Sequence, residues 1–485
     1  MVLKSVNQDH KKVVKERKMC KKHLNPEKII SLFTTINQNV IPLYNKHKKP
    51  YYMKQIWTFI WALLAILFVN CSSQQTPEIT PGTPNTEQDN NSPELREPRV
   101  IILSMDAFRH DLASMYETST LDSIARVGVY SEIMPCFPSN TFPNHYSMAT
   151  GLHPDHHGIV NNNFYDETLY KSYSISDEEA KTNAAFYKGE PIWNTVERQG
   201  LIAHVYGWVG IDAKVNGRKP TVAMSYDYRL SYKQLADLVI NAMCKEDLEQ
   251  IPNLVMWYFD QPDAVEHTYS PTSEQTRKVV EEIDDALGYF MSKIRKSPVF
   301  DNINFIFTSD HGMVELNPDK FFNVYSLIPD KIQYYYNSNP VTLKPRNLSE
   351  TKSIYNTLKA NEEKGHYRVW LREDMPEELH YGSYTTRIYP IVLLADTGWK
   401  VVYNKSANSG RPDAKYSNHG YNPYDKEMHM VFYGCGPAFK SGYTHDKVFQ
   451  NLNDHLIISH ILGIEPASPN DCTWTDIEGL FKGQN

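Results

Sequence analysis

The sequence predicts an α/β domain with a mostly parallel central sheet and helices on both faces. From Arg99 onward, short apolar runs rich in Val, Ile and Phe alternate with longer amphipathic stretches. This alternation is typical of parallel strands joined by helical crossovers. The clearest expected strands are Val100–Leu103, Leu254–Phe259, Ile303–Phe307 and Met430–Tyr433.

The clearest expected helix runs from about Ser273 to Lys296, where apolar residues recur every three or four positions. Thr272 and Gln275 have the spacing of a capping box at its start. A Pro- and Tyr-rich middle region, roughly 316–400, predicts a small irregular insertion before the sheet resumes.

The N-terminal region has the pattern of an export signal. Residues 56–69 form an apolar run shorter than the ~20 residues that a membrane-spanning helix needs, and they fit the core of a signal peptide. The segment Leu67-Phe68-Val69-Asn70-Cys71 loosely resembles a bacterial lipobox, in which the cysteine becomes lipidated. We therefore expect an exported lipoprotein that faces the periplasm or cell surface.

These signals divide the chain into four parts. We interpret residues 1–52 as an upstream extension of the reading frame, 53–70 as a signal peptide, 71–98 as a flexible linker and 99–485 as the catalytic domain. A type-II membrane anchor with a basic cytoplasmic tail is the alternative. Either way the domain lies outside the cytoplasm.

Charge and cysteine usage narrow the function classes. The formal net charge of −7 combines a basic segment over residues 1–52 with an acidic body, which argues against nucleic-acid binding over a broad surface. Any phosphate site must then be local.

The six cysteines form no CxxC pair, so a zinc ribbon or thioredoxin-type site has no support. Cys435 and Cys472 are either a disulfide or buried thiols.

Candidate metal ligands follow the expected strands. Three of the four strands are followed by an aspartate, and two of these aspartates have a histidine nearby. Each motif alone is commonplace, but groups that follow parallel strands collect at one edge of a sheet. Zinc prefers imidazole and carboxylate ligands, and three of each suit a two-metal centre. The candidates are Asp106, Asp263, His267, Asp310, His311 and His419.

A candidate nucleophile lies in the segment PSNTFPNHYSMATG, residues 138–151. Pro143 suits the first turn of a helix, which puts Thr141 at the helix N-terminus, where backbone amides favour a phosphate group. A threonine hydroxyl becomes an effective nucleophile when a metal activates it. The alternative is a simple N-cap. The asparagines of GIVNNNFYD could donate to a phosphoryl oxygen or only build a turn.

The blocks SMDAFR, NTFPNHYSMATGLHPDHHGIVNNNFYD, PDAVEH, TSDHGM and NHGY occur in this order. Together they resemble the nucleotide pyrophosphatase/phosphodiesterase family of the alkaline phosphatase superfamily, over about residues 99–475. The resemblance implies an alkaline-phosphatase-like fold and a compact bacterial member. It also implies hydrolysis of small nucleotides to a nucleoside 5′-monophosphate through a phosphothreonine.

The resemblance also implies roles for single residues. One zinc is held by Asp263, His267 and His419. The other is held by Asp106, Asp310 and His311, with the nucleophile Thr141. Asn162 matches the donor to the phosphoryl oxygen. The implied substrate pocket includes Phe142, Trp208 and Tyr226.

Two departures from the family pattern leave every ligand intact and bear on pocket shape. Glu266 stands where the family usually has Gly, and Trp208-Val209-Gly210 replaces Trp-Pro-Gly. A phosphodiesterase for lipid or choline head groups could use the same metal centre, although aromatic residues that can stack on a base favour nucleotides. A non-catalytic surface lipoprotein would have no need of six ligands and Thr141.

Overall fold

The computed structural model describes residues 97–406 and 417–483, which belong to one compact unit, Glu87–Asn485. The predicted signal peptide, Cys71 and nearly all of the linker lie outside the described residues. Within the described ranges, no helix combines the length and hydropathy that crossing a membrane requires.

An eight-stranded sheet forms the centre of this unit, in the order β18-β2-β17-β8-β1-β7-β5-β6. Strand β17 is antiparallel to both neighbours, and all other adjacent pairs are parallel. The expected mostly parallel sheet is therefore confirmed. The strands are β1 (Arg99–Met105), β2 (Val129–Met134), β5 (Ala203–Tyr206), β6 (Val222–Met224), β7 (Leu254–Phe259), β8 (Ile303–Thr308), β17 (Met430–Cys435) and β18 (Tyr443–Gln450).

The four strands expected from the sequence are β1, β7, β8 and β17, which lie next to one another in the middle of the sheet. They are easy to detect because both of their faces are buried, which requires nearly continuous apolar runs. In β1, Ile102 packs into one core cluster, while Ile101 and Leu103 pack into the other.

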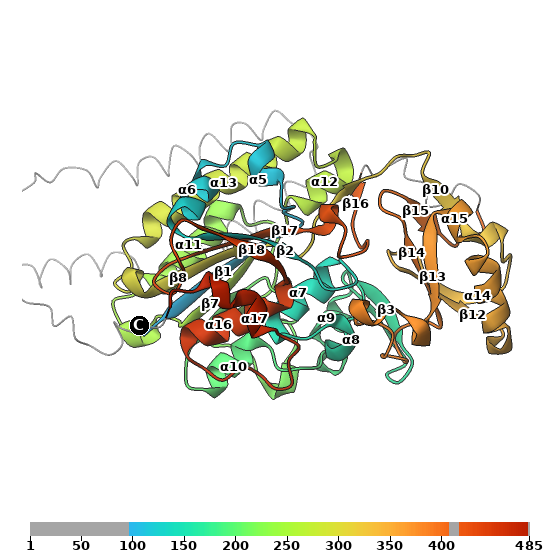
Figure 1. Ribbon diagram of the computed structural model, residues 1–485. Coiled ribbons are helices and arrows are strands. Elements are labelled where there is room, and N and C mark those ends of the chain that lie inside the picture. The colour runs from blue at the N-terminus through green and yellow to red at the C-terminus, as the bar shows by residue number, and fades with distance from the viewer. Residues whose placement is uncertain (1–96, 407–416, 484–485) are drawn as a thin grey trace, which may run out of the picture. The chain divides into compact units, whose positions relative to one another are not determined.

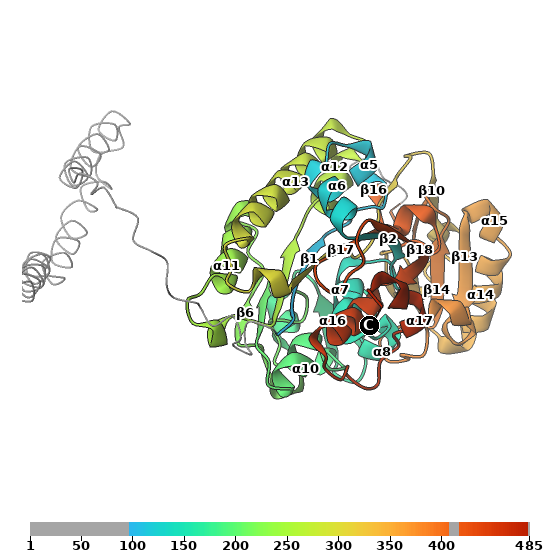
Figure 2. The same cartoon turned by 60° about the vertical axis from the view of Figure 1, so that its left-hand side comes forward.

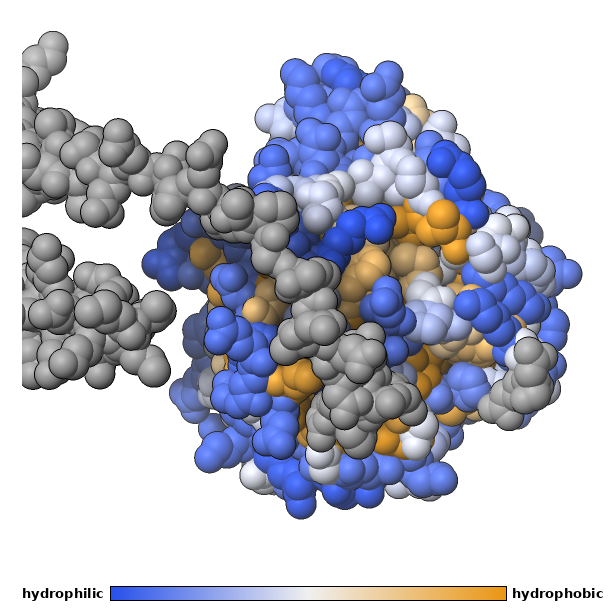
Figure 3. All heavy atoms as spheres, turned by 90° about the vertical axis from the view of Figure 1, so that its left-hand side faces the viewer, coloured by the Kyte–Doolittle hydropathy of each residue, from blue (hydrophilic) through white to orange (hydrophobic). Residues whose placement is uncertain are grey.

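Helices cover both faces of the sheet, as the alternation predicts (Figures 1 and 2). One core cluster contains apolar residues of α7 (Thr141–Thr150), α10 (Ile192–Arg198) and α16 (Asp454–Leu462). The other contains those of α6 (Ser119–Val127), α11 (Tyr232–Met243) and α13 (Glu274–Ile294). On the face shown in Figure 3, hydrophilic residues dominate the margin and hydrophobic residues are visible between them.

Helix α13 matches the expected helix to within two residues at each end, but the expected capping box is wrong. The N-cap is Ser273, whose hydroxyl accepts a hydrogen bond from the backbone N–H of Thr276 at 3.1 Å. Thr272 lies before the helix and contacts the hydroxyl of Ser270 instead. Thr272 and Ser273 both have side chains that can cap a helix. Which of them occupies the N-cap position depends on the backbone conformation of the segment before the helix.

The insertion expected around 316–400 is present and more regular than expected. It contains a four-stranded antiparallel sheet in the order β11-β12-β14-β13, with α14 beside it (Figure 1). Ile354 and Leu358 of α14 join the core cluster of this sheet. The elements are β11 (Ile332–Tyr336), β12 (Val341–Pro345), α14 (Thr351–Lys359), β13 (Tyr367–Leu371) and β14 (Ile391–Ala395).

The described cysteines are thiols. Cys435 and Cys472 are not joined, and the same holds for Cys136 and Cys244. Burial raises the pKa of the Cys435 thiol to about 12, which keeps it protonated and unreactive at neutral pH. Of the two expectations for Cys435 and Cys472, free thiols describe the structure, with Cys435 buried and Cys472 partly buried.

Candidate active site

Three aspartates meet at one edge of the central sheet. Strand β1 lies between β7 and β8, so the residues that follow these strands are neighbours. Asp106 follows β1 directly, Asp310 follows β8, and Asp263 begins the helix α12 (Asp263–Tyr269) after β7. The backbone N–H of Asp263 donates to the carbonyl of Asp106 at 3.1 Å, which ties two of these loops together.

The first cluster consists of Asp106, Asp310 and His311, all buried, with their ligand atoms within 4.8 Å of one another. Nε2 of His311 lies 3.2 Å from Oδ2 of Asp310 and 3.5 Å from Oδ1 of Asp106. The hydroxyl oxygen of Thr141 lies 3.1 Å from the same nitrogen. The candidate nucleophile and this cluster therefore share one site.

One oxygen of each carboxylate in this cluster is held by the protein, and the other is not. Oδ1 of Asp310 accepts from the N–H of Ala107, and Oδ2 of Asp106 accepts from the phenol of Tyr258. Oδ2 of Asp310 and Oδ1 of Asp106 are buried and have no hydrogen-bond partner among the described residues. Burial, together with the charges of Asp310 and Asp263, raises the pKa of Asp106 well above its ordinary value. Such crowded carboxylates suit a bound cation.

The second cluster consists of Asp263, His267 and His419, again with ligand atoms within 4.8 Å. Asp263 and His267 are four residues apart on α12, as expected, and Nε2 of His267 lies 3.4 Å from Oδ1 of Asp263. Nε2 of His419 lies 3.6 Å from the same oxygen. That oxygen is buried and accepts no hydrogen bond from any described residue.

The three histidines are all oriented with Nε2 toward the carboxylates. In each ring Nδ1 lies beside a backbone carbonyl, which can only accept, so Nδ1 carries the hydrogen and Nε2 keeps its lone pair. The carbonyls are those of Gly312 for His311 at 2.9 Å, Ser417 for His267 at 2.9 Å and Ser139 for His419 at 3.1 Å. Three such nitrogens and three carboxylates fit two zinc ions.

The two clusters adjoin each other. The rings of His311 and His419 stack with centroids 3.9 Å apart and an angle of 17° between their planes. Because these rings belong to different clusters, the six candidate ligands form one continuous centre, as a two-metal site requires.

Thr141 is the first residue of α7 and Pro143 lies in its first turn, as expected, while the N-cap is Asn140. Oδ1 of Asn162 accepts a hydrogen bond from the N–H of Phe142 at 3.0 Å. The amide NH₂ of Asn162 is therefore the group that can donate to a ligand beside Thr141. The helix N-terminus and this amide both suit an anion.

Sequence reasoning missed His145, one helical turn after Thr141. Its Nδ1 donates to the carbonyl of Thr141 at 2.9 Å, and its Nε2 lies 2.9 Å from the hydroxyl of Ser104 on β1. The i, i+4 spacing from Thr141 was the signal that could have found it. His145 fastens the first turn of α7 to the sheet.

A cavity of about 290 Å³ opens beside Thr141. The three residues expected to form the substrate pocket, Phe142, Trp208 and Tyr226, all line it. Trp208 is 1% exposed, and its indole N–H donates to the carbonyl of His145, so it forms a rigid wall. Tyr226 is 43% exposed, and its hydroxyl donates to Asp260 at 2.7 Å.

Residues 100–425 match the family model described as type I phosphodiesterase / nucleotide pyrophosphatase. The chain belongs to this family.

Curated relatives agree with the family model. Over 421 residues the chain is 30% identical to ectonucleotide pyrophosphatase/phosphodiesterase family member 3 of Rattus norvegicus, covering 85% of this chain and 46% of the relative. Over 397 residues it is 32% identical to bis(5′-adenosyl)-triphosphatase ENPP4 of Bos taurus, covering 81% and 84%. The chain thus spans less than half the length of the first relative and most of the second.

Solved structures agree with the expected fold class. Murine ectonucleotide pyrophosphatase/phosphodiesterase 5 superposes with a TM-score of 0.72 at 28% identity, covering 79% of this chain and all of that chain. A second structure of that protein, an inactive threonine-to-alanine variant in complex with AMP, gives the same TM-score and covers 80% of this chain.

Further residues complete the cavity of this phosphodiesterase-family chain. Lys181 is the only Lys or Arg among its lining residues, and its ammonium pairs with Glu178 at 2.6 Å. Asp212 and Asp260 line it as well. No local motif in the sequence marks these three residues, because they reach the cavity from separate segments.

The two departures from the family pattern differ in their effect on the site. Val209 lines the cavity, so the change in the Trp208-Val209-Gly210 segment does alter its wall. Glu266 is fully buried and does not line it. Burial raises the pKa of Glu266 well above its ordinary value.

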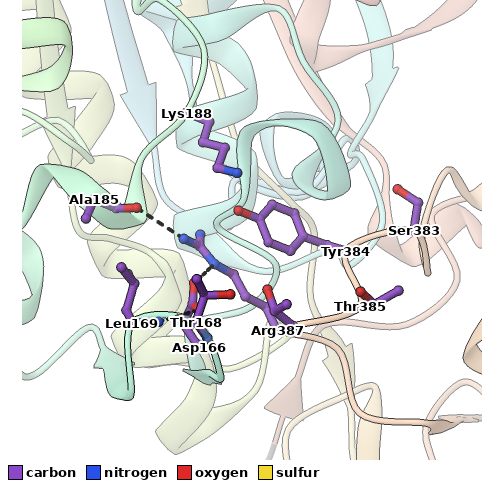
Figure 4. A pocket seen from close by; sticks show the side chains of 10 residues that line it. Asp166, Thr168, Leu169, Ala185, Lys188, Ser383, Tyr384, Thr385 and Arg387 are labelled. Atoms are coloured by element: carbon purple, nitrogen blue, oxygen red, sulfur yellow. Dashed lines mark hydrogen bonds and ion pairs between the residues drawn. The ribbon is translucent and has the colours of Figure 1, made fainter.

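A second hollow, of about 440 Å³, lies between the β3 (Asn163–Asp166) region and the insertion (Figure 4). Its buried cation, Arg387, pairs with Asp166 at 2.6 Å and donates to the carbonyls of Gly158, Ala185 and Phe186. These contacts use the guanidinium of Arg387 to hold three segments together. None of the candidate ligands of the active site lines this hollow.

Proposed function

We propose that the chain is a nucleotide pyrophosphatase/phosphodiesterase that hydrolyses a phosphodiester or phosphoanhydride bond and releases a nucleoside 5′-monophosphate. The observation that carries the proposal is the position of the Thr141 hydroxyl. It lies 3.1 Å from Nε2 of His311, one of the six candidate ligands, and Thr141 also lines the cavity with its aromatic residues. The triphosphatase name of the bovine relative and the AMP complex of the murine relative support a nucleotide substrate.

We propose zinc as the metal, two ions per chain. Asp263, His267 and His419 would hold one ion. Asp106, Asp310 and His311, with Thr141, would hold the other. When bound, the ions supply positive charge for the attacking, leaving and phosphoryl oxygens.

The chain's own residues account for the covalent chemistry. Oγ1 of Thr141 loses its proton and attacks phosphorus, and the leaving group departs with the electrons of the broken bond and takes up a proton from water. A water molecule then hydrolyses the phosphothreonine, which releases the monophosphate and restores the hydroxyl of Thr141. Backbone amides at the start of α7 and the NH₂ of Asn162 stabilise the charge on the phosphoryl oxygens. His145 supports this geometry, since its bond to the carbonyl of Thr141 fixes the first turn of the helix.

In the proposed substrate complex, the nucleoside occupies the cavity beside Thr141. Phe142 and Tyr226 offer ring faces to a base, and Lys181 offers positive charge to a further phosphate. A choline head group is the second candidate. Asp212 and Asp260 in the cavity, together with the ring of Tyr226, would also attract a quaternary ammonium group.

A comparison of two chromogenic esters tests the assignment. Wild-type chain with zinc is assayed on p-nitrophenyl thymidine 5′-monophosphate and on p-nitrophenyl phosphorylcholine. The nucleotide proposal requires a higher kcat/KM on the thymidine ester. A clear preference for the choline ester would overturn the nucleotide assignment and leave the roles of Thr141 and the metal centre in place.

For the location, we propose an exported protein that is tethered to a membrane through lipidated Cys71. The support is the apolar run at residues 56–69 followed by the lipobox-like segment that ends at Cys71. A tether of this kind would present the active site to nucleotides outside the cytoplasm.

A further inference from the structure

A third group of potential metal ligands lies apart from the active site. It consists of His153, His156 and Asp471, whose ligand atoms lie within 4.8 Å of one another. His153 is the N-cap of α8 (Pro154–His157), and His156 lies within that helix. Asp471 precedes α17 (Trp474–Ile477), so residues more than 300 positions apart converge here.

A single carboxylate oxygen is the centre of this group. Oδ2 of Asp471 lies 2.7 Å from Nδ1 of His156 and 3.1 Å from Nδ1 of His153, and it accepts the backbone N–H of His153 at 2.8 Å. The backbone N–H of Asp471 donates to the carbonyl of Gly151, the C-cap of α7. Both imidazoles therefore direct the same ring atom at a carboxylate whose backbone is fixed.

The contacts of His153 select which of its nitrogens can bind a metal. Its Nε2 lies 3.1 Å from Oε1 of Gln450, an oxygen that can only accept, so Nε2 carries a hydrogen. In a neutral imidazole the lone pair is then on Nδ1, which faces the carboxylate of Asp471. A lone pair opposite a carboxylate is repulsive unless a proton or a metal ion lies between them.

The site is supported from inside and open from outside. The side chain of His153 is 5% exposed, that of Asp471 20% and that of His156 49%. The ring of His380 stacks on that of His153 at a centroid distance of 4.0 Å, which holds the inner ring in place. An ion can enter past His156 and meet ligands that are already oriented.

We infer that His153, His156 and Asp471 bind one divalent transition metal ion of the zinc type. Two imidazoles and one carboxylate, with water in the remaining position, form a common zinc ligand set, and a hydrogen bond that orients a ligand histidine is typical of such sites. The bound ion joins α8, which follows the C-terminal end of α7, to the segment before α17. Since Thr141 is at the other end of α7, the ion stabilises the fold and takes no part in the reaction.

The test is the zinc content of the full chain after saturation with zinc and removal of the unbound metal. His156→Gln is the main variant, because His156 is half exposed and its loss leaves the contacts of His153 with Asp471 intact. We expect one zinc fewer per chain than in wild type. The matched control is His366→Asn, which changes another histidine near a single aspartate, Asp396, and should keep the wild-type content.

Two further measurements separate a metal site from a histidine–aspartate ion pair. Zinc should raise the Tm of metal-free wild type further than that of metal-free His156→Gln, while kcat at saturating zinc is equal in both. Cobalt-substituted wild type should show a visible absorption component that His156→Gln lacks. If the variant binds as much zinc as wild type, the group is an ion pair only and the inference is wrong.

Discussion

The phenol of Tyr258 donates a hydrogen bond to Oδ2 of Asp106, while Oδ1 of the same carboxylate is buried with no hydrogen-bond partner in residues 97–406 and 417–483. The two oxygens therefore have different tasks. One is fixed by the protein, and the other is directed at the first ligand cluster. Tyr258 orients a candidate ligand without itself being one.

Removing this bond should weaken the centre. Tyr258→Phe is expected to lower kcat/KM by about tenfold to a hundredfold and to weaken zinc binding, the usual range for a group that orients a metal ligand. Tyr289→Phe is the control, because it removes a similar phenol-to-aspartate bond, to Asp237, away from the site. Wild-type kcat/KM and zinc affinity in Tyr258→Phe would refute this role.

Thr141→Ala should abolish turnover because no other group in the centre can form the phosphoenzyme. Its zinc content should stay equal to that of wild type, since six protein ligands remain. Thr141→Ser should retain part of the activity because a hydroxyl is still present. Steady-state kinetics and metal analysis check these outcomes, and more than a few per cent of wild-type kcat in Thr141→Ala would rule out the covalent mechanism.

Removal of metal should inactivate the enzyme and lower its Tm. Without a cation, the neighbouring carboxylates of Asp106, Asp310 and Asp263 repel one another, and folding must then overcome that repulsion. Dialysis against a chelator followed by stepwise return of zinc should restore both properties together. Full activity after exhaustive chelation would exclude a metal-dependent reaction.

Phe142→Ala should reduce kcat/KM for nucleotides by about tenfold to a hundredfold. The ring lines the cavity directly after Thr141, stacking on a base contributes ~1–3 kcal/mol, and ~1.4 kcal/mol is a factor of ten. A smaller ester such as bis-p-nitrophenyl phosphate should be affected less. Equal losses on both substrates would mean that Phe142 supports the helix start rather than the nucleoside.

Lipid labelling in a bacterial host should modify the wild-type chain at Cys71. Cys71→Ala should be unlabelled and should leave the membrane fraction or remain unprocessed, because the thiol is the group that accepts the lipid. A chain that begins at Met53 should be processed like the full-length chain. Normal labelling of Cys71→Ala would contradict the lipobox interpretation.

Local patterns predicted the elements that depend on local physics. The strand Leu254–Phe259 is found at its expected residues because a strand buried on both faces must be continuously apolar. The long helix is found because its amphipathic periodicity extends over many turns. Its N-cap, Ser273, was missed because the choice of cap depends on the backbone conformation of the preceding segment. The insertion was expected, but its antiparallel sheet was not.

The sequence by itself determined the fold class, the residue types of the centre and Thr141 at a helix start. All of these follow from spacing over a few residues or from motifs in order along the chain. Only the tertiary structure decided that β17 runs antiparallel, that His419 stacks on His311, and that Lys181 reaches the cavity. These relationships join segments tens to hundreds of residues apart, so they are set by how sheet and helices pack together and leave no trace in local periodicity.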